Sequence, residues 1–140
     1  MSFREKIHWV AFVTMTLAFG WYFLRYPWQI ADGRAGLAAT AGMLVPVTIA
    51  IIAAMTVATA LLAIRSPADV DLTEDERDRM FHRRGTHLAY YPLVLGVWAT
   101  IVLIFWGAQP GLLLNLLLAA VVCAELVRIG SQILFYRRGY

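Results

Sequence analysis

Four polar side chains share one face of the last apolar run of the sequence, Leu112 to Tyr136. On a helical wheel of roughly 100° per residue they fall within about 80° of one another: Glu125, Arg128, Gln132 and Tyr136. Glu125 and Arg128 are i,i+3 neighbours whose charges can neutralise each other. Two interpretations stay open: a structural ion pair that fixes the register of a helix bundle, or a proton- or ligand-linked site that opens to the cytoplasm.

The depth of this run in a membrane determines the cost of its charges. A helix rises ~1.5 Å per residue, so Glu125 lies roughly 20 Å from the start of the run and roughly 18 Å from Arg137, close to the middle of a bilayer. A charge there costs at least ~2.5–3.5 kcal/mol, so it should face protein or water. Asn115 lies nearer the other end and about 80° from the polar face. We expect it to form an interhelical hydrogen bond or a cap.

The other side chains that could catalyse reactions or bind metals form no recognisable set. His82 and His87 do not have the i,i+4 spacing of a helical metal pair, and His8 is far away in the sequence. The single cysteine, Cys123, lies inside the last apolar run, where packing is its expected role. The sequence has no glycine-rich phosphate loop and no serine–histidine–aspartate set. We therefore expect no enzymatic activity, no catalytic residue, no metal and no cofactor.

The composition is typical of a membrane protein. Of the 140 residues, 61% are hydrophobic, whereas soluble domains are ~45–50% apolar. Four apolar runs are each near the ~20 residues needed to cross a bilayer, at residues 7–24, 37–64, 88–106 and 112–136. We predict one all-α domain over residues 1–140, with four transmembrane helices.

The first two spans carry patterns that predict their surroundings. Aromatic residues gather at the far end of the first span as an interfacial belt: Trp21, Tyr22, Tyr26 and Trp28. In the second span small residues recur at every fourth position: Ala38, Gly42, Pro46, Ala50, Ala54 and Ala58. Such a stripe allows membrane helices to approach closely. We interpret it as packing within the monomer, with a dimer interface as the alternative, and expect Pro46 to kink the helix.

Residues 65–87 form the only sizeable polar segment. Thr73 and Glu76 match a capping box, in which each side chain bonds the backbone amide of the other residue. We predict a short cytoplasmic helix from Thr73 to Arg84, between the second and third spans, with Gly85 either ending it or tolerated within it. The predicted binding site for a cytoplasmic partner consists of its basic residues: Arg77, Arg79, Arg83 and Arg84.

The basic residues are distributed unevenly between the two sides of the predicted topology. One side holds Arg4, Lys6, Arg65, Arg77, Arg79, Arg83, Arg84, Arg137 and Arg138, and the other holds Arg25 and Arg34. Positively charged loops stay in the cytoplasm, so both termini are predicted to be cytoplasmic. The net charge of +3 is explained by membrane orientation, and no direct binding to nucleic acid is expected.

Several groups of residues spread along the chain form a set. They are Arg4-Glu5-Lys6 with Trp9, Gly20-Trp21-Tyr22-Phe23, Asp75-Glu76-Arg77-Asp78 before Tyr90-Tyr91, Asn115 with Ala124-Glu125-Leu126-Val127-Arg128, and Gln132 with Tyr136-Arg137-Arg138-Gly139. Over nearly the whole chain this set resembles a family of small four-helix bacterial inner-membrane proteins of unknown function. Members of similar families are often encoded beside helix-turn-helix regulators. The resemblance therefore implies an inner-membrane location and a regulatory or sensing role.

These observations together predict a small integral inner-membrane protein that is a non-enzymatic interaction or regulatory module. Its expected partners are the lipid bilayer, a cytoplasmic regulator, and a second copy or larger assembly. The alternative is a small proton-linked transporter that uses Glu125. Small multidrug exporters also have four spans and one buried carboxylate. Their carboxylate lies in the first span, however, and residues 7–24 here contain no acid.

Overall fold

The computed structural model describes residues 3–30, 33–65 and 76–138. Its long helices are α1 (Phe3–Arg25), α2 (Gly33–Arg65), α3 (Glu76–Phe105) and α4 (Pro110–Arg138), and a short 3-10 helix, η1 (Trp28–Ile30), follows α1. The described residues contain no strand. Each long helix includes a segment that is long and apolar enough to cross a membrane. The prediction of an all-α fold with four apolar helices is therefore confirmed.

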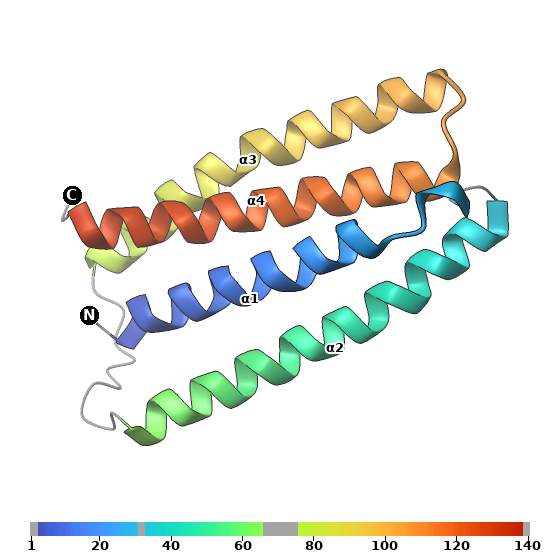
Figure 1. The fold of residues 1–140 in the computed structure, drawn as a ribbon. Helices are drawn as coiled ribbons and strands as arrows, with labels where there is room; N and C mark the ends of the chain where they lie inside the picture. The colour runs from blue at the N-terminus through green and yellow to red at the C-terminus, as the bar shows by residue number, and fades with distance from the viewer. Residues whose placement is uncertain (1–2, 31–32, 66–75, 139–140) are drawn as a thin grey trace.

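Successive helices run in opposite directions, and their order across the molecule is α3, α4, α1, α2 (Figure 1). The start of α1 and the end of α4 lie at one end of the bundle, which is also where α2 ends and α3 begins (Figure 1). We call this the basic end, because it carries Lys6, Arg65, Arg79, Arg83, Arg84, Arg137 and Arg138. Arg25 and Arg34 lie at the opposite end.

Helix α4 is the central element and contacts all three other long helices, α3 most extensively. Small residues allow these close contacts. A Cβ atom added at Gly96 of α3 would collide with Ala120 of α4. A Cβ atom added at Gly85 would lie 3.0 Å from Gln132 Cγ and 3.1 Å from the Arg128 carbonyl oxygen. The two glycines thus bring the α3 backbone against α4 at two levels, as small residues commonly do in membrane helix pairs.

Helix α2 packs on the bundle through its first half. Its buried residues are Gly36, Thr40 and Val47, and no residue of the helix after Val47 is buried. Val47 joins Tyr22 and Tyr26 in a small core, against which Leu118 of α4 also packs. Toward Arg65 the helix diverges from α4 (Figure 1). The second half of α2 is therefore only partly covered by the rest of the chain.

The stripe of small residues on α2 does not pack within the monomer. Its members from Ala38 to Ala54 are all exposed, and Ala58 is half-buried. A Cβ atom added at Gly42 would meet nothing within 4 Å. The helix presents a different face, that of Thr40 and Val47, to α1 and α4. The monomer-packing interpretation is therefore wrong, because the face with Gly36, Thr40 and Val47 makes the contact instead, and the dimer alternative stays a prediction.

The predicted short cytoplasmic helix is also not a separate element. Its described part, from Glu76 onward, is the beginning of α3, which continues without a break to Phe105. Residues 73–75, with Thr73 of the capping box, lie outside the described residues. The helix is continuous through Gly85, where close packing against α4 leaves little room for a side chain. The third helix therefore extends well past the apolar run that predicted it.

The predicted aromatic belt divides into two pairs. Trp21 and Trp28 are exposed, as a belt requires, whereas Tyr22 and Tyr26 are buried in contacts with α2 and α4. The belt prediction is wrong for the two tyrosines, whose hydroxyl groups find partners inside the bundle. Threonine hydroxyls elsewhere in the spans bond back to their own helices, as Thr48 does to the Leu44 carbonyl at 2.9 Å. Helix α2 is continuous through Pro46.

Candidate functional site

The ion pair predicted on the last helix is present. Both Nε and Nη2 of Arg128 donate to the same carboxylate oxygen of Glu125, Oε2, at 2.9 and 2.6 Å. The other oxygen, Oε1, accepts no hydrogen bond from any residue that the structure describes. The side chains of Arg128 and Glu125 are 31% and 38% exposed. One helix thus supplies both charges, and about a third of their side-chain surface is left uncovered by the chain.

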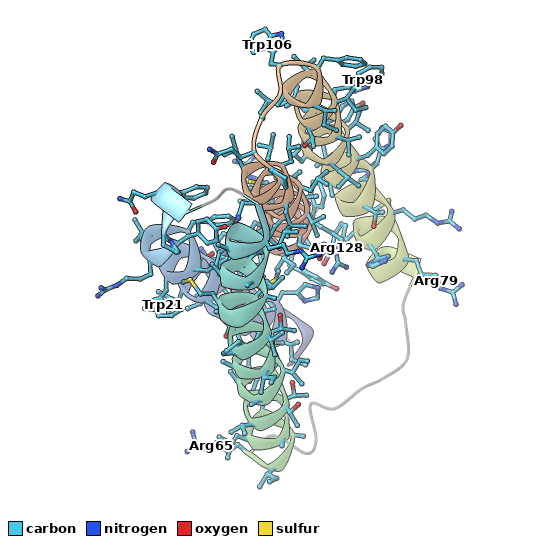
Figure 2. All side chains as sticks on the ribbon, turned by 90° about the vertical axis from the view of Figure 1, so that its right-hand side faces the viewer. Trp21, Arg65, Arg79, Trp98, Trp106 and Arg128 are labelled. Carbon is cyan, nitrogen blue, oxygen red and sulfur yellow. The ribbon has the colours of Figure 1, made fainter. Side chains whose placement is uncertain are left out.

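The exposed side of the pair lies on the face of α4 between α2 and α3. Figure 2 shows Arg128 on the side of α4 directed toward the space between these two helices. Val121, one turn before Glu125 on the same face, is 50% exposed. We call this surface, defined by Leu117, Val121, Glu125 and Arg128, the open face of α4. It is uncovered because α2 diverges from the bundle at this level.

The contacts between α3 and α4 show how far the ion pair lies from the basic end of the bundle. Gly85 lies against Arg128, Ser131 and Gln132, so the charged residues Arg83 and Arg84 are close to the level of Ser131. Glu125 lies about 9 Å deeper than Ser131 along α4, at ~1.5 Å per residue. It is therefore within the apolar part of the bundle, in the half nearer the basic end, where an unpaired charge is costly.

The predicted polar face does not continue as an open surface to the end of α4. Gln132 is buried, and its Nε2 lies 3.2 Å from Nδ1 of His82 on α3. The Tyr136 ring packs against Phe81 and His8, with centroid distances of 5.3 and 5.8 Å. Gln132 and Tyr136 therefore contact the neighbouring helices α3 and α1. Of the four residues predicted to form one polar face, only Glu125 and Arg128 remain partly uncovered.

Asn115 is the centre of a second polar cluster at the opposite end. Its Oδ1 accepts a hydrogen bond from the Tyr22 hydroxyl at 2.7 Å, and its Nδ2 donates to the Gly111 carbonyl at 2.8 Å and to Thr40 Oγ1 at 3.3 Å. Tyr26 lies 3.0 Å from Thr40 Oγ1 and donates to the Gly36 carbonyl at 3.2 Å. The interhelical hydrogen bond predicted for Asn115 is confirmed, and it joins α1, α2 and α4.

Three members of this Asn115 cluster are not identified by the sequence analysis: Tyr22, Tyr26 and Thr40. The tyrosines had been assigned to the membrane interface, and threonines are common in spans. The signal that could have found them is Asn115 itself, because an amide in a bilayer needs several partners. The sequence gives no indication of which hydroxyl groups supply them.

The residues predicted to bind a cytoplasmic partner occupy the first turns of α3. Arg79, Arg83 and Arg84 are exposed, and the side chain of Arg77 lies outside the described residues. Open hollows flank the helix here. One of about 480 Å³ is lined by His82, Arg83, Thr86, His87 and Tyr90. Another of about 420 Å³ is lined by Arg83, Arg84, His87, Leu88 and Phe135. The basic residues thus lie along a helix that is long and apolar enough to cross a membrane, rather than on a separate domain.

The described residues suggest little covalent chemistry. They contain no group of three or more histidine, cysteine, aspartate or glutamate side chains that could hold a metal ion. Cys123 is exposed on α4 and forms no disulfide. What Glu125 and Arg128 do offer is recognition, through a carboxylate oxygen without a protein partner and a guanidinium with further N–H donors. Their arrangement fits binding of a complementary polar group in the membrane.

The chain matches no protein-family model, no curated protein and no solved structure. The resemblance to small four-helix inner-membrane proteins therefore stays a prediction, and the function is argued from the geometry of the chain itself.

Proposed function

We propose that the protein is a non-enzymatic interaction module of the membrane that associates with a second copy of itself through the open face of α4. The observation that carries the proposal is the Glu125–Arg128 pair, about a third of whose surface is uncovered. Glu125 lies deeper along α4 than the charged turns of α3, and lipid tails cannot hydrogen-bond with its carboxylate. Contact with another polar protein surface removes this cost, so the pair is a favourable place for association.

A second copy is the occupant that best fits the chemistry. In each copy Glu125 has one carboxylate oxygen left to accept, and Arg128 has N–H groups left to donate. A two-fold axis along the membrane normal would place the Arg128 of one copy beside the Glu125 of the other, twice over, as isologous interfaces do. Each charge would then have two opposite charges nearby. The neighbouring valine and leucine side chains supply apolar contact area.

Cysteine cross-linking tests this association. In a Cys123→Ala background, Val121→Cys places a thiol on the open face. Val127→Cys places one about 120° around the helix from Val121, at about 100° per residue, as a matched control. Val127 is also exposed, at 39%. A two-fold interface brings the same position of both copies together, so oxidised membranes should give a covalent dimer with Val121→Cys and much less with Val127→Cys. Equal cross-linking, or a monomeric mass in mild detergent with no cross-link, would refute the proposal.

The proposed location is the bacterial inner membrane, with both termini in the cytoplasm. Support comes from the charge distribution, because seven basic residues whose side chains the structure describes lie at the basic end, and Arg25 and Arg34 lie at the other. The bacterial membrane itself follows only from the family resemblance. Reporter fusions test the orientation: one at the C-terminus should report cytoplasm and one at Gly33 periplasm. The opposite pattern would reverse the assignment.

Proton-linked transport is the second candidate, and the uncovered Oε1 of Glu125 is the observation that favours it. The close bonds from Arg128 argue against it, because a proton carrier must exchange its counter-charge for a proton in every cycle. Purified protein in vesicles distinguishes the two. A proton flux that Glu125→Gln abolishes would favour transport over association, whereas no flux with the native protein would remove this candidate.

A further inference from the structure

The basic end of α3 carries a second surface that the proposed association does not use. The two hollows of about 480 and 420 Å³ lie on adjoining sides of this helix and share Arg83 and His87. No acidic residue is among the described residues that line the two hollows. A negatively charged group placed between Arg83 and His87 would therefore meet donors and positive charge without a competing carboxylate from those lining residues.

The level of these residues in the membrane follows from the length of α3. The stretch Leu88–Phe105 is uncharged and extends about 27 Å at ~1.5 Å per residue. A hydrocarbon core is ~30 Å thick, so this stretch nearly fills it. Trp98 of α3 and Trp106, the residue after the helix end, extend away from the other helices (Figure 2), as expected for a helix facing lipid. Arg83 and His87 consequently lie at the level of the lipid headgroups.

The linings of the hollows change from polar to apolar in the direction of the membrane core. Arg83 and Thr86 are at the outer part of the first hollow, and the exposed ring of Tyr90 lies one turn deeper. The second hollow runs from Arg84 to Leu88 and Phe135. A soluble acidic peptide would pair with the arginine side chains but would not cover the apolar side chains that line the deeper part of each hollow. A phospholipid satisfies both, because its phosphate and its acyl chains are separated along the same axis.

We infer that the first turns of α3 bind an anionic phospholipid, with its phosphate between Arg83 and His87 and its acyl chains along Tyr90, Leu88 and Phe135. Guanidinium groups bind phosphate oxygens through paired N–H bonds, and basic clusters at the ends of membrane helices attract anionic headgroups. The bound lipid would fill both hollows beside α3. This inference does not depend on self-association through α4, because none of its residues belongs to the open face.

The test compares lipid retention by the full-length protein in mild detergent, measured by native mass spectrometry. Phosphatidylglycerol and phosphatidylcholine with the same acyl chains are the probes. We expect phosphatidylglycerol to be retained at least tenfold more strongly. Arg83→Gln should reduce this preference about fivefold, which corresponds to roughly 1 kcal/mol for one basic residue near a membrane surface. Arg65→Gln removes the same charge from the same end, at the exposed end of α2, and should leave the preference unchanged.

Several outcomes would overturn the inference. Equal retention of the two lipids by the native protein is one, and this comparison needs no variant to fold. An equal loss with Arg65→Gln and Arg83→Gln would mean diffuse surface charge rather than a site. Displacement of the lipid by an equal concentration of glycerol phosphate would assign the hollows to a soluble phosphate. Absence of any lipid preference, combined with binding of an acidic soluble protein that Arg83→Gln abolishes, would assign them to a cytoplasmic partner.

Discussion

The bundle has two clusters of polar side chains centred on α4, and they differ in how completely the chain buries them. The Asn115 cluster draws side chains from α1, α2 and α4, and Tyr22 and Asn115 are 0% and 1% exposed. The Glu125–Arg128 pair comes from α4 alone and is about a third exposed. In the first cluster every side-chain polar group has a partner among the described residues. The second leaves acceptor and donor capacity unused.

The course of α2 explains the difference. Near its start α2 lies against α1 and α4, and Thr40 reaches both Tyr26 and Asn115. Near its end the helix has diverged from α4 (Figure 1) and has no buried residue, so α2 does not cover the Glu125–Arg128 pair. A closed polar cluster in a membrane specifies how helices pack, because its groups have no alternative partner in lipid. An ion pair that the chain leaves partly uncovered still has hydrogen-bonding groups free for another molecule, so it is better suited to binding. Four predictions test this contrast.

Replacing Asn115 should have the largest effect on stability. Asn115→Leu keeps the approximate volume but leaves the Tyr22 hydroxyl and the Thr40 side chain with fewer partners. Leaving buried groups unsatisfied costs about 1–3 kcal/mol, and we expect a loss in that range. The midpoint of unfolding in mixed detergent micelles measures it. Leu114→Ala, at an exposed neighbouring position, is the control. Similar midpoints for the two variants would mean that the cluster does not hold the helices together.

The ion pair should respond differently to single and double changes. Breaking a fully buried pair costs ~3–5 kcal/mol. This pair is partly exposed, so Glu125→Gln and Arg128→Leu should each cost less, about 1–2 kcal/mol. The double variant removes both charges and should recover most of the monomer stability while losing the cross-link at Val121→Cys. Unfolding midpoints and cross-linking yields are the two measurements. A double variant that still forms the dimer would show that the pair is only structural.

These two sites also show how much could be predicted from the sequence. The Glu125–Arg128 pair is local, so i,i+3 spacing was sufficient to predict it, and the apolar runs were sufficient to predict four helices. The partners of Asn115 are Tyr22 and Thr40, which are 93 and 75 residues away. Identifying them requires the rotation of α1 and α2 about their axes. The apolar residues around these helices give little indication of it, since polar and apolar faces are not distinct in a membrane span.

For a related physical reason, the sequence did not predict that α3 begins before the apolar run and continues through Gly85. Gly85 follows Arg83 and Arg84, and in a soluble protein such a sequence favours a helix end. Here the close approach of α4 requires a residue without a side chain and keeps the helix continuous. For the small residues of α2, too, the sequence does not indicate which helix, if any, lies against them. Their spacing indicates that close packing can occur on that face, but not whether a helix of the same chain is present there.

Removal of one hydroxyl from the buried cluster should have a smaller effect than loss of the amide. Tyr22→Phe keeps the ring contacts and deletes the hydrogen bond to Asn115 Oδ1. Side-chain hydrogen bonds between membrane helices average ~0.6 kcal/mol, and we expect a loss of about that size. Tyr90→Phe is the matched control, because Tyr90 is 60% exposed and should change the unfolding midpoint very little. Equal shifts would mean that the Tyr22 hydroxyl contributes nothing specific.

The smallest effect is expected at Ala54, on the uncovered half of α2. Ala54 is exposed, so Ala54→Leu adds a side chain that meets lipid, and the unfolding midpoint should change by no more than about 0.5 kcal/mol, as is usual at surface positions. Ala120→Leu is the contrasting substitution. Ala120 lies against Gly96, and forcing a larger side chain there should cost about 1–3 kcal/mol. A loss at Ala54 as large as that at Ala120 would mean that another helix covers α2 in the assembled protein. The small-residue stripe would then belong to an interface, and the divergence of α2 would be a property of the isolated chain.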